Sequence, residues 1–399
     1  MRAALMPLTI VMLPQVALSA VQMGLPVLAP ALVADLGLAP EMIGPIGGCI
    51  GLGSVWMFAA NHSVTPVLGP VRALGLAGLL AVIGVMFAVS GWLPGVLLGA
   101  VFIGFAYAVT APAGSQILSD HVPRAFWGTV FSIRQAGVPL GGAIAGVLGA
   151  GVAVAHGWQA GLLCLALLPG FCIALPYLVP QSFVGGQSTD TFRLSGLFQP
   201  SILARPFGTL RALPQLNALV LASLGFACVQ GSVFAFFTTY MIDGLGLGLA
   251  WAGTLFAVMQ IASFTGRIGA GFVADHIGSL RKVLLGMSLA AAAACLILSL
   301  LQPGLSIPVL IGVAIFAGAT AATWNGLFLA EIARCVPQDQ VSTATAGVTF
   351  FTFVAYMLTP PVFALVVYLF GYQIGYCMSA CAALFSFVCL RRVSVVRIT

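Results

Sequence analysis

Residues 271–300 read GFVADHIGSLRKVLLGMSLAAAAACLILSL, and this stretch contains both features that decide the fold. Its first part carries Asp275, Arg281 and Lys282 among glycines, a composition typical of a short solvated connection. The remainder is an uncharged apolar run of about 20 residues, the length at which an α-helix crosses a bilayer. The stretch therefore predicts a transmembrane helix that begins directly after a basic loop.

The same alternation of apolar run and polar connection extends along the whole chain. Of its 399 residues 61% are hydrophobic and 6% are charged, and the mean hydropathy is +1.15, which excludes an ordinary soluble domain. We predict an all-α membrane protein with twelve transmembrane helices in two six-helix bundles. The predicted spans are 7–33, 41–61, 73–92, 94–118, 127–151, 159–179, 214–240, 248–270, 282–301, 306–330, 342–368 and 372–390.

Basic residues predict how these spans are oriented. Of the 14 Lys and Arg residues, all but Arg134 lie at the termini or in connections that follow even-numbered spans. Positive residues stay in the cytoplasm during insertion, so we expect both termini there. The net charge of +6 follows from this rule and does not indicate nucleic-acid binding. The residues concerned are Arg2, Arg72, Arg124, Arg193, Arg205, Arg211, Arg267, Arg281, Lys282, Arg334, Arg391, Arg392 and Arg397.

The longest connection divides the chain into two halves. It covers 181–213, so we expect an N-terminal bundle at 1–180 and a C-terminal bundle at 214–399. A repeated element supports this division, because Gly278 and Arg281 of the second half recur at one common offset as Gly69 and Arg72 of the first. Parallel duplication of a six-helix unit is a common transporter architecture.

The twelve spans and the motif Gly-x-x-x-Asp-x-x-Gly-x-x-Arg-Lys at 271–282 resemble the major facilitator superfamily. The first-half copy departs from the pattern, with His62 and Pro66 in place of its Gly and Asp. The resemblance covers essentially the whole chain. It implies two halves that rock about a central site, and a cytoplasmic latch that biases the two states. We assign to this latch the residues Arg267, Gly271, Asp275, Gly278, Arg281, Glu331 and Arg334.

Two further segments are similar to one branch of that superfamily. Ser132-Ile-Arg134-Gln135-Ala-Gly137 and Trp324-Asn325-Gly326 look most like the cyanate and nitroimidazole permeases. The segment 137–142, Gly-Val-Pro-Leu-Gly-Gly, resembles the glycine-proline signature of the superfamily's antiporters with one residue inserted. An efflux antiporter is therefore the alternative to a permease.

Amides inside the spans indicate a polar central cavity. The resemblance implies that helices 1, 4, 7 and 10 line the cavity with help from 2, 5, 8 and 11. An amide in hydrocarbon is costly without partners, and the amides well inside the spans all lie on these eight helices. They are Gln15, Gln22, Gln116, Gln135, Gln230, Gln260 and Asn325.

Arg134 is the sharpest candidate for substrate binding. It lies seven residues past Trp127, about 10 Å into the membrane at 1.5 Å per residue. A guanidinium at that depth needs an anion, an amide cage or water, and its bidentate fork suits a carboxylate. The alternative is that Arg134 snorkels to the cytoplasmic surface or braces the helix entrance.

The remaining binding candidates surround this arginine. With Arg134 we assign Gln135, Gln15, Gln22, Gln230, Gln260, Trp324, Asn325 and Tyr356 to substrate binding. Phe234, Phe237 and Tyr240 are candidates for an apolar wall. Small residues at 137, 141, 145 and 149, beside others at 142, 146 and 150, predict a close, sliding helix contact between the halves.

Acidic residues and histidines lie near the ends of the spans and form no catalytic or metal-binding cluster. We therefore expect no enzyme, no cofactor and no metal. Three routes of energy coupling stay open: a proton taken by Asp35 or Glu41 near the outer mouth, a proton carried with the substrate, or passive transport.

These observations predict a secondary transporter of a small polar organic solute, favouring an organic anion, that alternates access by a rocker-switch. The alternatives are a proton-coupled drug or metabolite efflux antiporter and a membrane sensor that does not transport. We expect a monomer in the inner membrane of a bacterium, with the bilayer and a small-molecule substrate as partners, the proton as candidate coupling ion, and no nucleic acid.

Overall fold

The computed structural model describes residues 2–61, 64–122, 127–184, 201–336 and 341–392. Within these ranges the chain is helical and contains no strand. Eleven of its helical segments are long and apolar enough to cross a membrane. Three of the basic residues used to predict orientation, Arg124, Arg193 and Arg397, lie outside the described residues.

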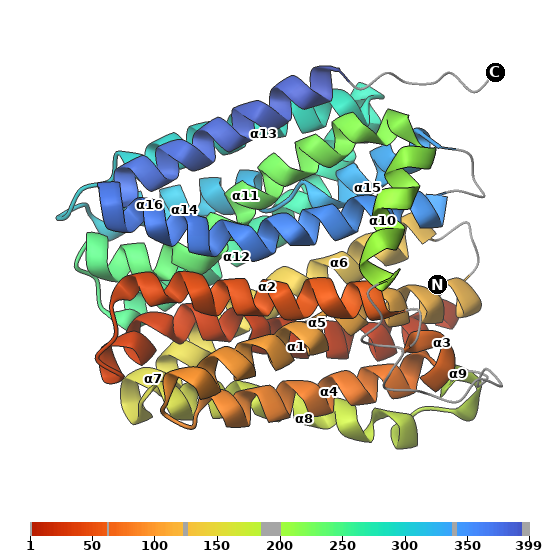
Figure 1. Cartoon of the computed structure of the whole chain (residues 1–399), viewed down its shortest axis with the longest axis horizontal. Coiled ribbons are helices and arrows are strands. Elements are labelled where there is room, and N and C mark those ends of the chain that lie inside the picture. Colours follow the sequence, from red (N-terminus) through yellow and green to blue (C-terminus); the bar gives the residue numbers. More distant parts are fainter. Residues whose placement is uncertain (1, 62–63, 123–126, 185–200, 337–340, 393–399) are drawn as a thin grey trace.

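The first half of the chain supplies the lower layer of Figure 1. Its longest helix, α1, contains four prolines, which are tolerated where neighbouring helices satisfy the freed backbone groups. Its elements are α1 (Arg2–Asp35), η1 (Pro40–Met42), α2 (Ile43–Ala60), α3 (Thr65–Leu68), α4 (Pro70–Ala88), α5 (Leu93–His121), α6 (Trp127–Ile144), the π-helical turn η4 (Ala145–Gly149), α7 (Ala150–His156), α8 (Trp158–Leu178) and α9 (Gln181–Val184).

The second half forms the upper layer, with α10 running across one end of both layers (Figure 1). Its elements are α10 (Ser201–Ala212), η6 (Pro214–Leu216), α11 (Asn217–Thr239), the π-helical turn η7 (Tyr240–Gly244), α12 (Leu249–Ile277), α13 (Leu280–Ser299), α14 (Ile307–Ala321), α15 (Asn325–Arg334) and α16 (Val341–Arg391).

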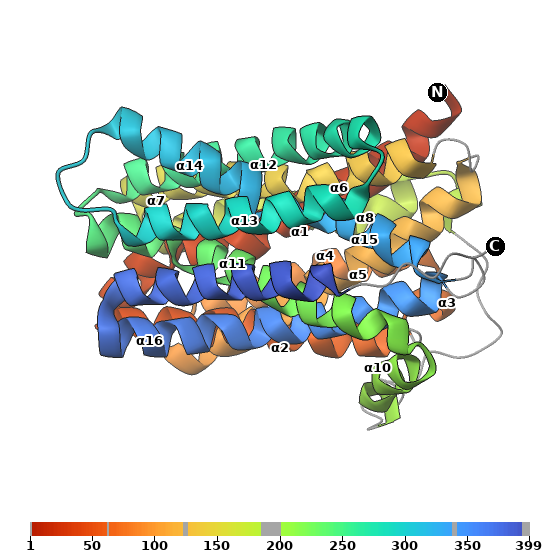
Figure 2. The ribbon, with the colours of Figure 1, turned by 90° about the horizontal axis from the view of Figure 1, so that it is seen from above.

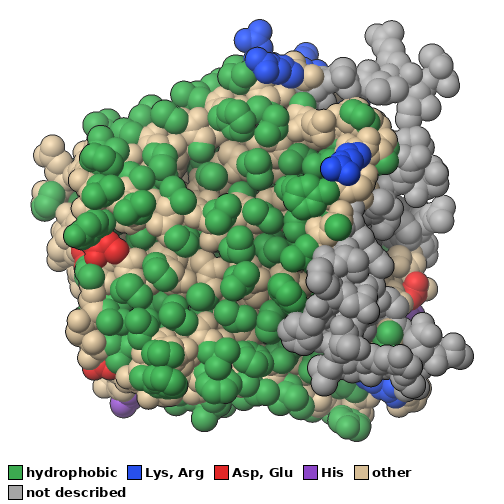
Figure 3. All heavy atoms as spheres, viewed as in Figure 1, with side chains coloured by type: hydrophobic (Ala, Val, Ile, Leu, Met, Phe, Trp, Pro, Cys, Tyr) green, Lys and Arg blue, Asp and Glu red, His purple; other side chains and the backbone are tan. Residues whose placement is uncertain are grey.

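The helices run side by side along the long axis of the molecule, as expected of a membrane bundle. The start of α1 and the end of α16 lie at the same end of it (Figures 1 and 2). Hydrophobic side chains cover the face seen in Figure 3, and the charged side chains visible there lie toward the two ends. This apolar belt between charged ends is the surface that a multi-pass membrane protein presents to lipid.

The helices of the second half are interrupted at two places, one at a predicted span boundary and one inside a predicted span. Gly371, in the predicted connection between the last two spans, has φ 83° and ψ 169° and interrupts α16, whose two limbs fold back on each other (Figure 2). Glycine accommodates this positive φ without a Cβ clash. The predicted span at 306–330 corresponds to one candidate crossing, Ile307–Ile332, but its helix is interrupted inside the span, stopping at Ala321 and restarting at Asn325. There Thr320, inside α14, and Thr323, in the break, donate to the carbonyls of Phe316 and Ala319 of α14, which competes with regular helix geometry.

One hydrophobic core joins the two halves at the end where α1 finishes and α2 begins. It contains Leu25 and Leu28 of the first half together with Phe236 and Phe256 of the second. Toward the other end the core divides into separate clusters, one within each half. The halves are therefore packed together at one end and separated at the other.

Glycines permit the close packing at the joined end. Gly146 of η4 and Gly253 of α12 are so close that a Cβ on either would meet the other's carbonyl oxygen. At a second contact between the halves, a Cβ at Gly47 of α2 would lie 2.8 Å from the Cβ of Pro360 of α16. The prediction of one sliding stripe at 137–149 was wrong in part, because Gly141 packs on α1 of its own half.

Candidate functional site

A cavity of about 1280 Å³ occupies the space between the separated ends of the two halves. Its lining residues come from α1, α2, α5, α6, α10, α11, α12, α15 and the first limb of α16. The helices of predicted spans 3, 6, 9 and 12 contribute none of those residues, which matches the expectation for the cavity. Its lining extends to Asn61, Ser119 and Thr345, at the ends of α2, α5 and α16 where the halves are apart, so it opens there.

Arg134 lies in the wall of this cavity and is only 4% exposed. Its guanidinium turns toward α5, where Nη1 donates to Ser115 Oγ at 3.2 Å and Nη2 donates to the Thr110 carbonyl at 3.3 Å. Gly114 makes room for it, because a Cβ there would lie 2.9 Å from Arg134 Nε. The side chain does not snorkel to the surface, and its Nε has no hydrogen-bond partner.

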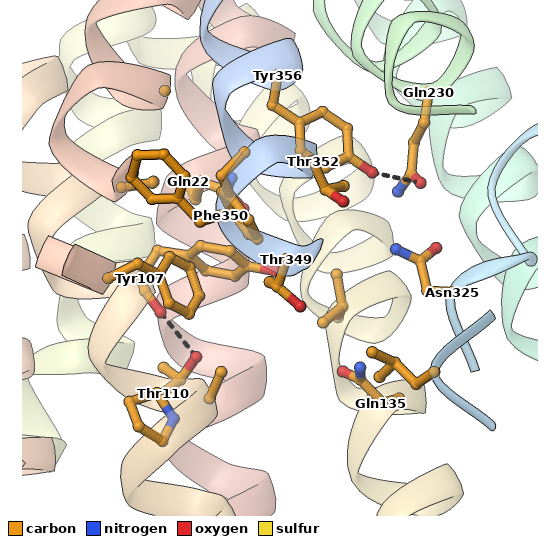
Figure 4. A pocket seen from close by; sticks show the side chains of 18 of the residues that line it. Gln22, Tyr107, Thr110, Gln135, Gln230, Asn325, Thr349, Phe350, Thr352 and Tyr356 are labelled. Carbon is orange, nitrogen blue, oxygen red and sulfur yellow. Dashed lines mark hydrogen bonds between the residues drawn. The ribbon is translucent and has the colours of Figure 1, made fainter. Parts of the chain in front are cut away.

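Gln230 organises the opposite wall. Its Oε1 accepts one hydrogen bond from Trp324 Nε1 at 2.9 Å and another from the Tyr356 hydroxyl at 2.7 Å (Figure 4). Phe226 stacks on the Trp324 ring with centroids 4.9 Å apart, which holds the indole in place. Because both donors occupy the amide oxygen, the amide nitrogen is the group that Gln230 can offer a ligand.

Most of the other candidates also reach the cavity. Figure 4 shows Gln22, Gln135 and Asn325 directed into the same space. Gln15 lines it as well and donates to Ser19 at 3.3 Å, one turn along α1. Gln260 is the exception: it is fully buried outside the lining, with its Nε2 3.2 Å from Met23 Sδ across the joined halves.

The structure places Arg267 in the cavity and not at a cytoplasmic latch. The sequence prediction ended this span at residue 270, whereas α12 continues to Ile277 and leaves Arg267 ten residues inside the helix. Nη1 donates to the Gln135 carbonyl of the other half at 2.8 Å, and Nη2 donates to the Ala322 carbonyl at 3.1 Å. The apolar residues that follow Arg267, such as Ile268, Phe272 and Val273, could have indicated that the helix continues past it.

The broken helix explains one of these contacts. Between α14 and α15 the Ala322 carbonyl is released from regular helical pairing and accepts from Ser263 Oγ at 3.2 Å as well as from Arg267. The break also directs the N-terminal end of α15 at the cavity, where Trp324 and Asn325 are lining residues. The Asn325 Oδ1 is buried without a hydrogen-bond partner.

The aromatic wall differs from the prediction. Phe234 lines the cavity, but Phe237 is buried in the core and the Tyr240 hydroxyl donates to the Leu298 carbonyl at 3.0 Å. Phe237 and Tyr240 therefore lie in the core at the joined end and not in the cavity wall. Tyr107, Phe350 and Phe353 line the cavity instead, and no pattern in the sequence distinguishes them from aromatic residues of the core.

The remaining latch residues lie near the open end. Arg281 donates to the Arg391 carbonyl, and Glu331 Oε2 is 3.9 Å from Arg334 Nη1, too long for a hydrogen bond. Gly278 ends α12 with φ 66°, and Gly271 lies inside that helix. Asp275 is in the last turn of α12, and Ser279 is the residue that caps α13; the Asp275 side chain lies outside the described part of the structure.

The described lining residues include two arginines but no Asp, Glu, His or Lys. Across the described ranges no group of His, Cys, Asp and Glu residues is arranged to hold a metal ion. The cavity is therefore positively charged and rich in amides and hydroxyls, a lining suited to polar and anionic ligands.

Comparison with known proteins is consistent with this architecture. The family model described as Major Facilitator Superfamily matches residues 12–329. No curated protein matches the sequence significantly.

Solved transporter structures share the fold at low sequence identity. A bacterial homologue of the human lysosomal transporter Spinster, inward-facing and unoccupied, is 14% identical with TM-score 0.75, covering 98% of this chain and 97% of its own. The nucleoside transporter NupG is 15% identical with TM-score 0.76, covering 97% and 99%. A POT family transporter bound to 5-aminolevulinic acid is 12% identical with TM-score 0.77, covering 96% and 94%.

The match of the family model over most of the chain, together with the two packed halves around a polar cavity, identifies a transporter and not an enzyme. The chain belongs to the major facilitator superfamily.

Proposed function

We propose that this protein is a secondary transporter of a small organic anion that alternates access by a rocker-switch. The observation that carries the proposal is Arg134, a nearly fully buried guanidinium in the cavity wall with no acidic side chain among the described lining residues. An uncompensated buried charge is costly, and a bound anion would compensate it. The amides of Gln22, Gln135 and Asn325 would hydrogen-bond the polar remainder of the substrate.

The topology that supports this function has twelve crossings and cytoplasmic termini. Twelve crossings are supported by the described helices if α14 and α15 are taken as one crossing and the two limbs of α16 as two. We place the N-terminal bundle at 1–180, the connection at 181–213 and the C-terminal bundle at 214–399. The cavity then opens toward the cytoplasm. The close contacts of Gly146 with Gly253 and of Gly47 with Pro360 close the outer end. We place the protein in the inner membrane of a bacterium, as a monomer.

A latch near the open end would bias this state without touching substrate. Its proposed members are Asp275, Arg281, Gly271, Gly278, Glu331 and Arg334, in or beside the ends of α12 and α15. We expect Asp275→Asn to change maximal uptake rate about two- to fivefold, the range for an exposed ion pair, with KM unchanged. Initial-rate uptake at varied substrate concentration measures both. Asp120→Asn, at the exposed end of α5, is the control; a change of KM alone would contradict the latch.

Uptake into proteoliposomes tests the transport proposal. Radiolabelled organic acids and hydrophobic cationic drugs are compared in vesicles with and without the protein, with and without an imposed proton gradient. Saturable uptake of acids, competed by other acids, is the expected result. Uptake of cations alone would favour drug efflux by proton antiport, with Phe234, Phe350 and Phe353 of the cavity wall contacting the apolar parts of the drug.

Two further outcomes concern the sensor alternative and the coupling ion. Binding of acids without uptake would favour a sensor. A response of uptake to the imposed gradient would identify protons as the coupling ion.

The same experiment addresses the permease branch. The segments 132–137 and 324–326, which resemble the cyanate and nitroimidazole permeases, contribute Arg134, Gln135, Trp324 and Asn325 to the cavity. Competition by cyanate for uptake of a labelled acid would support that assignment, because cyanate is a small anion. Failure of cyanate to compete would contradict the assignment to the permease branch but would not affect the proposal of anion transport.

A further inference from the structure

Two arginines from different halves line the same cavity. Arg134 comes from α6 and Arg267 from α12, and both line the same space. The two side chains enter the cavity at neighbouring positions of its wall, since Arg267 Nη1 donates to the backbone carbonyl of Gln135, the residue that follows Arg134. The cavity therefore carries a cation on each side of the boundary between the halves.

Neither arginine is neutralised by the protein. Their hydrogen bonds end on uncharged oxygens, those of Thr110, Ser115, Gln135 and Ala322. The Nε of each is buried and has no hydrogen-bond partner. The described lining has no carboxylate to pair with either of them. Each guanidinium has lost hydration without gaining a counterion, so one bound negative charge would leave the other arginine uncompensated.

The break between α14 and α15 adds to the positive potential. α15 has ten residues and starts at Asn325 in the cavity, so its unpaired first-turn N–H groups and the positive end of its dipole face the site. The Ala322 carbonyl at the same break holds Arg267 next to it. A helix interrupted in the membrane with its N-terminus at the cavity is a common arrangement for binding an anionic group.

We propose that the substrate is a dianion with two carboxylates, which binds one on Arg134 and the other on Arg267 and the N-terminus of α15. This inference rests on the proposed transport of organic anions and narrows it. A dicarboxylate would span the two halves, and its second carboxylate would compete with the Gln135 carbonyl for Arg267. A monocarboxylate would satisfy one arginine and leave the other without a counterion.

Ligand-induced thermal stabilisation of the purified protein tests how many carboxylates the ligand needs. Malonate, succinate and glutarate are titrated beside propionate, butyrate and valerate, with sulfate as an inorganic dianion, all at constant ionic strength. We expect at least one dicarboxylate to bind about tenfold or more tightly than the monocarboxylate of similar length, the usual loss when one charge-assisted contact is missing. Equal binding of the two classes, or equal stabilisation by sulfate, would overturn the dicarboxylate.

Variants assign the second carboxylate to Arg267. Arg267→Gln should weaken dicarboxylate binding about tenfold or more and leave monocarboxylate binding nearly unchanged, because the Arg134 end remains. Arg267→Lys retains the charge and should restore part of the dicarboxylate preference. Arg211→Gln, an exposed arginine on α10, is the matched control and should change neither.

Two results separate this inference from the transport proposal. If Arg267→Gln lowers binding of both classes alike, or of neither, while Arg134 is still required for monocarboxylates, the two-ended site is wrong and anion transport stands. If no carboxylate of either class binds, both proposals fail. Monodisperse elution and an unchanged ligand-free melting temperature for Arg267→Lys ensure that the comparison concerns folded protein.

Discussion

Arg134→Ala is expected to reduce carboxylate uptake severely while leaving the protein folded. A charge-assisted hydrogen bond to a buried partner contributes about 1.5–3 kcal/mol, so substrate affinity should fall by roughly 10- to 150-fold. The partners on α5 do not depend on the arginine: Ser115 Oγ also donates to the Ala111 carbonyl at 2.8 Å within its own helix. Uptake of the labelled acid at a concentration near the wild-type KM measures the loss.

The melting temperature without ligand distinguishes binding from bracing. Removing an unpaired buried charge should leave the melting temperature unchanged or raise it, because the desolvation penalty disappears with the charge. If Arg134 only braces α6 against α5, the melting temperature falls and residual uptake per folded molecule stays near normal. Arg211→Ala, on the exposed face of α10, is the control for the removal of an arginine.

Gly114→Ala offers a second way to disturb the same group. Its added Cβ would lie 2.9 Å from Arg134 Nε and 2.7 Å from a methyl of Val11, so the guanidinium must move although its charge remains. Reduced uptake in this variant, together with an increase in KM, would indicate that the position of Arg134 matters and not the charge alone.

Gly253→Val is expected to reduce uptake about fivefold or more by opening the joined end of the molecule. The valine Cβ would meet the Gly146 carbonyl oxygen and lie 2.5 Å from the Ala150 methyl, on a surface where neither backbone can yield easily. Overpacking of this kind costs about 1–3 kcal/mol, which shifts the equilibrium between the two conformations roughly 5- to 150-fold away from the described state. Initial-rate uptake into proteoliposomes measures the effect.

A nearby glycine supplies the control for this substitution. Gly151 of α7 has open space within 4 Å of its Cβ position, so Gly151→Val should retain uptake close to wild type. Wild-type uptake by Gly253→Val would mean that the halves do not need this close approach at Gly146 during transport. Loss of uptake in both variants would point to a general effect of valine in these helices instead.

Much of this architecture follows from the sequence because it depends on local composition. A run of about 20 apolar residues is stable as a helix in lipid wherever it occurs in the chain. An amide on such a helix must face away from lipid, so the positions of Gln15, Gln22, Gln135 and Gln230 pointed to the cavity without any knowledge of packing. Arg134 was found for the same reason, since a charge at that depth has few acceptable places.

Only the tertiary structure decided which buried groups share one site. Arg267 is a cavity residue because α12 continues to Ile277, and its contact with Gln135 joins helices more than 100 residues apart in the sequence. The break before Asn325 depends on carbonyls satisfied by side chains of another helix, and Gln260 and Phe237 face the joined end because the halves pack there. Local hydropathy measures the transfer of a segment into lipid, whereas the facing of one helix toward another is set by packing between distant segments.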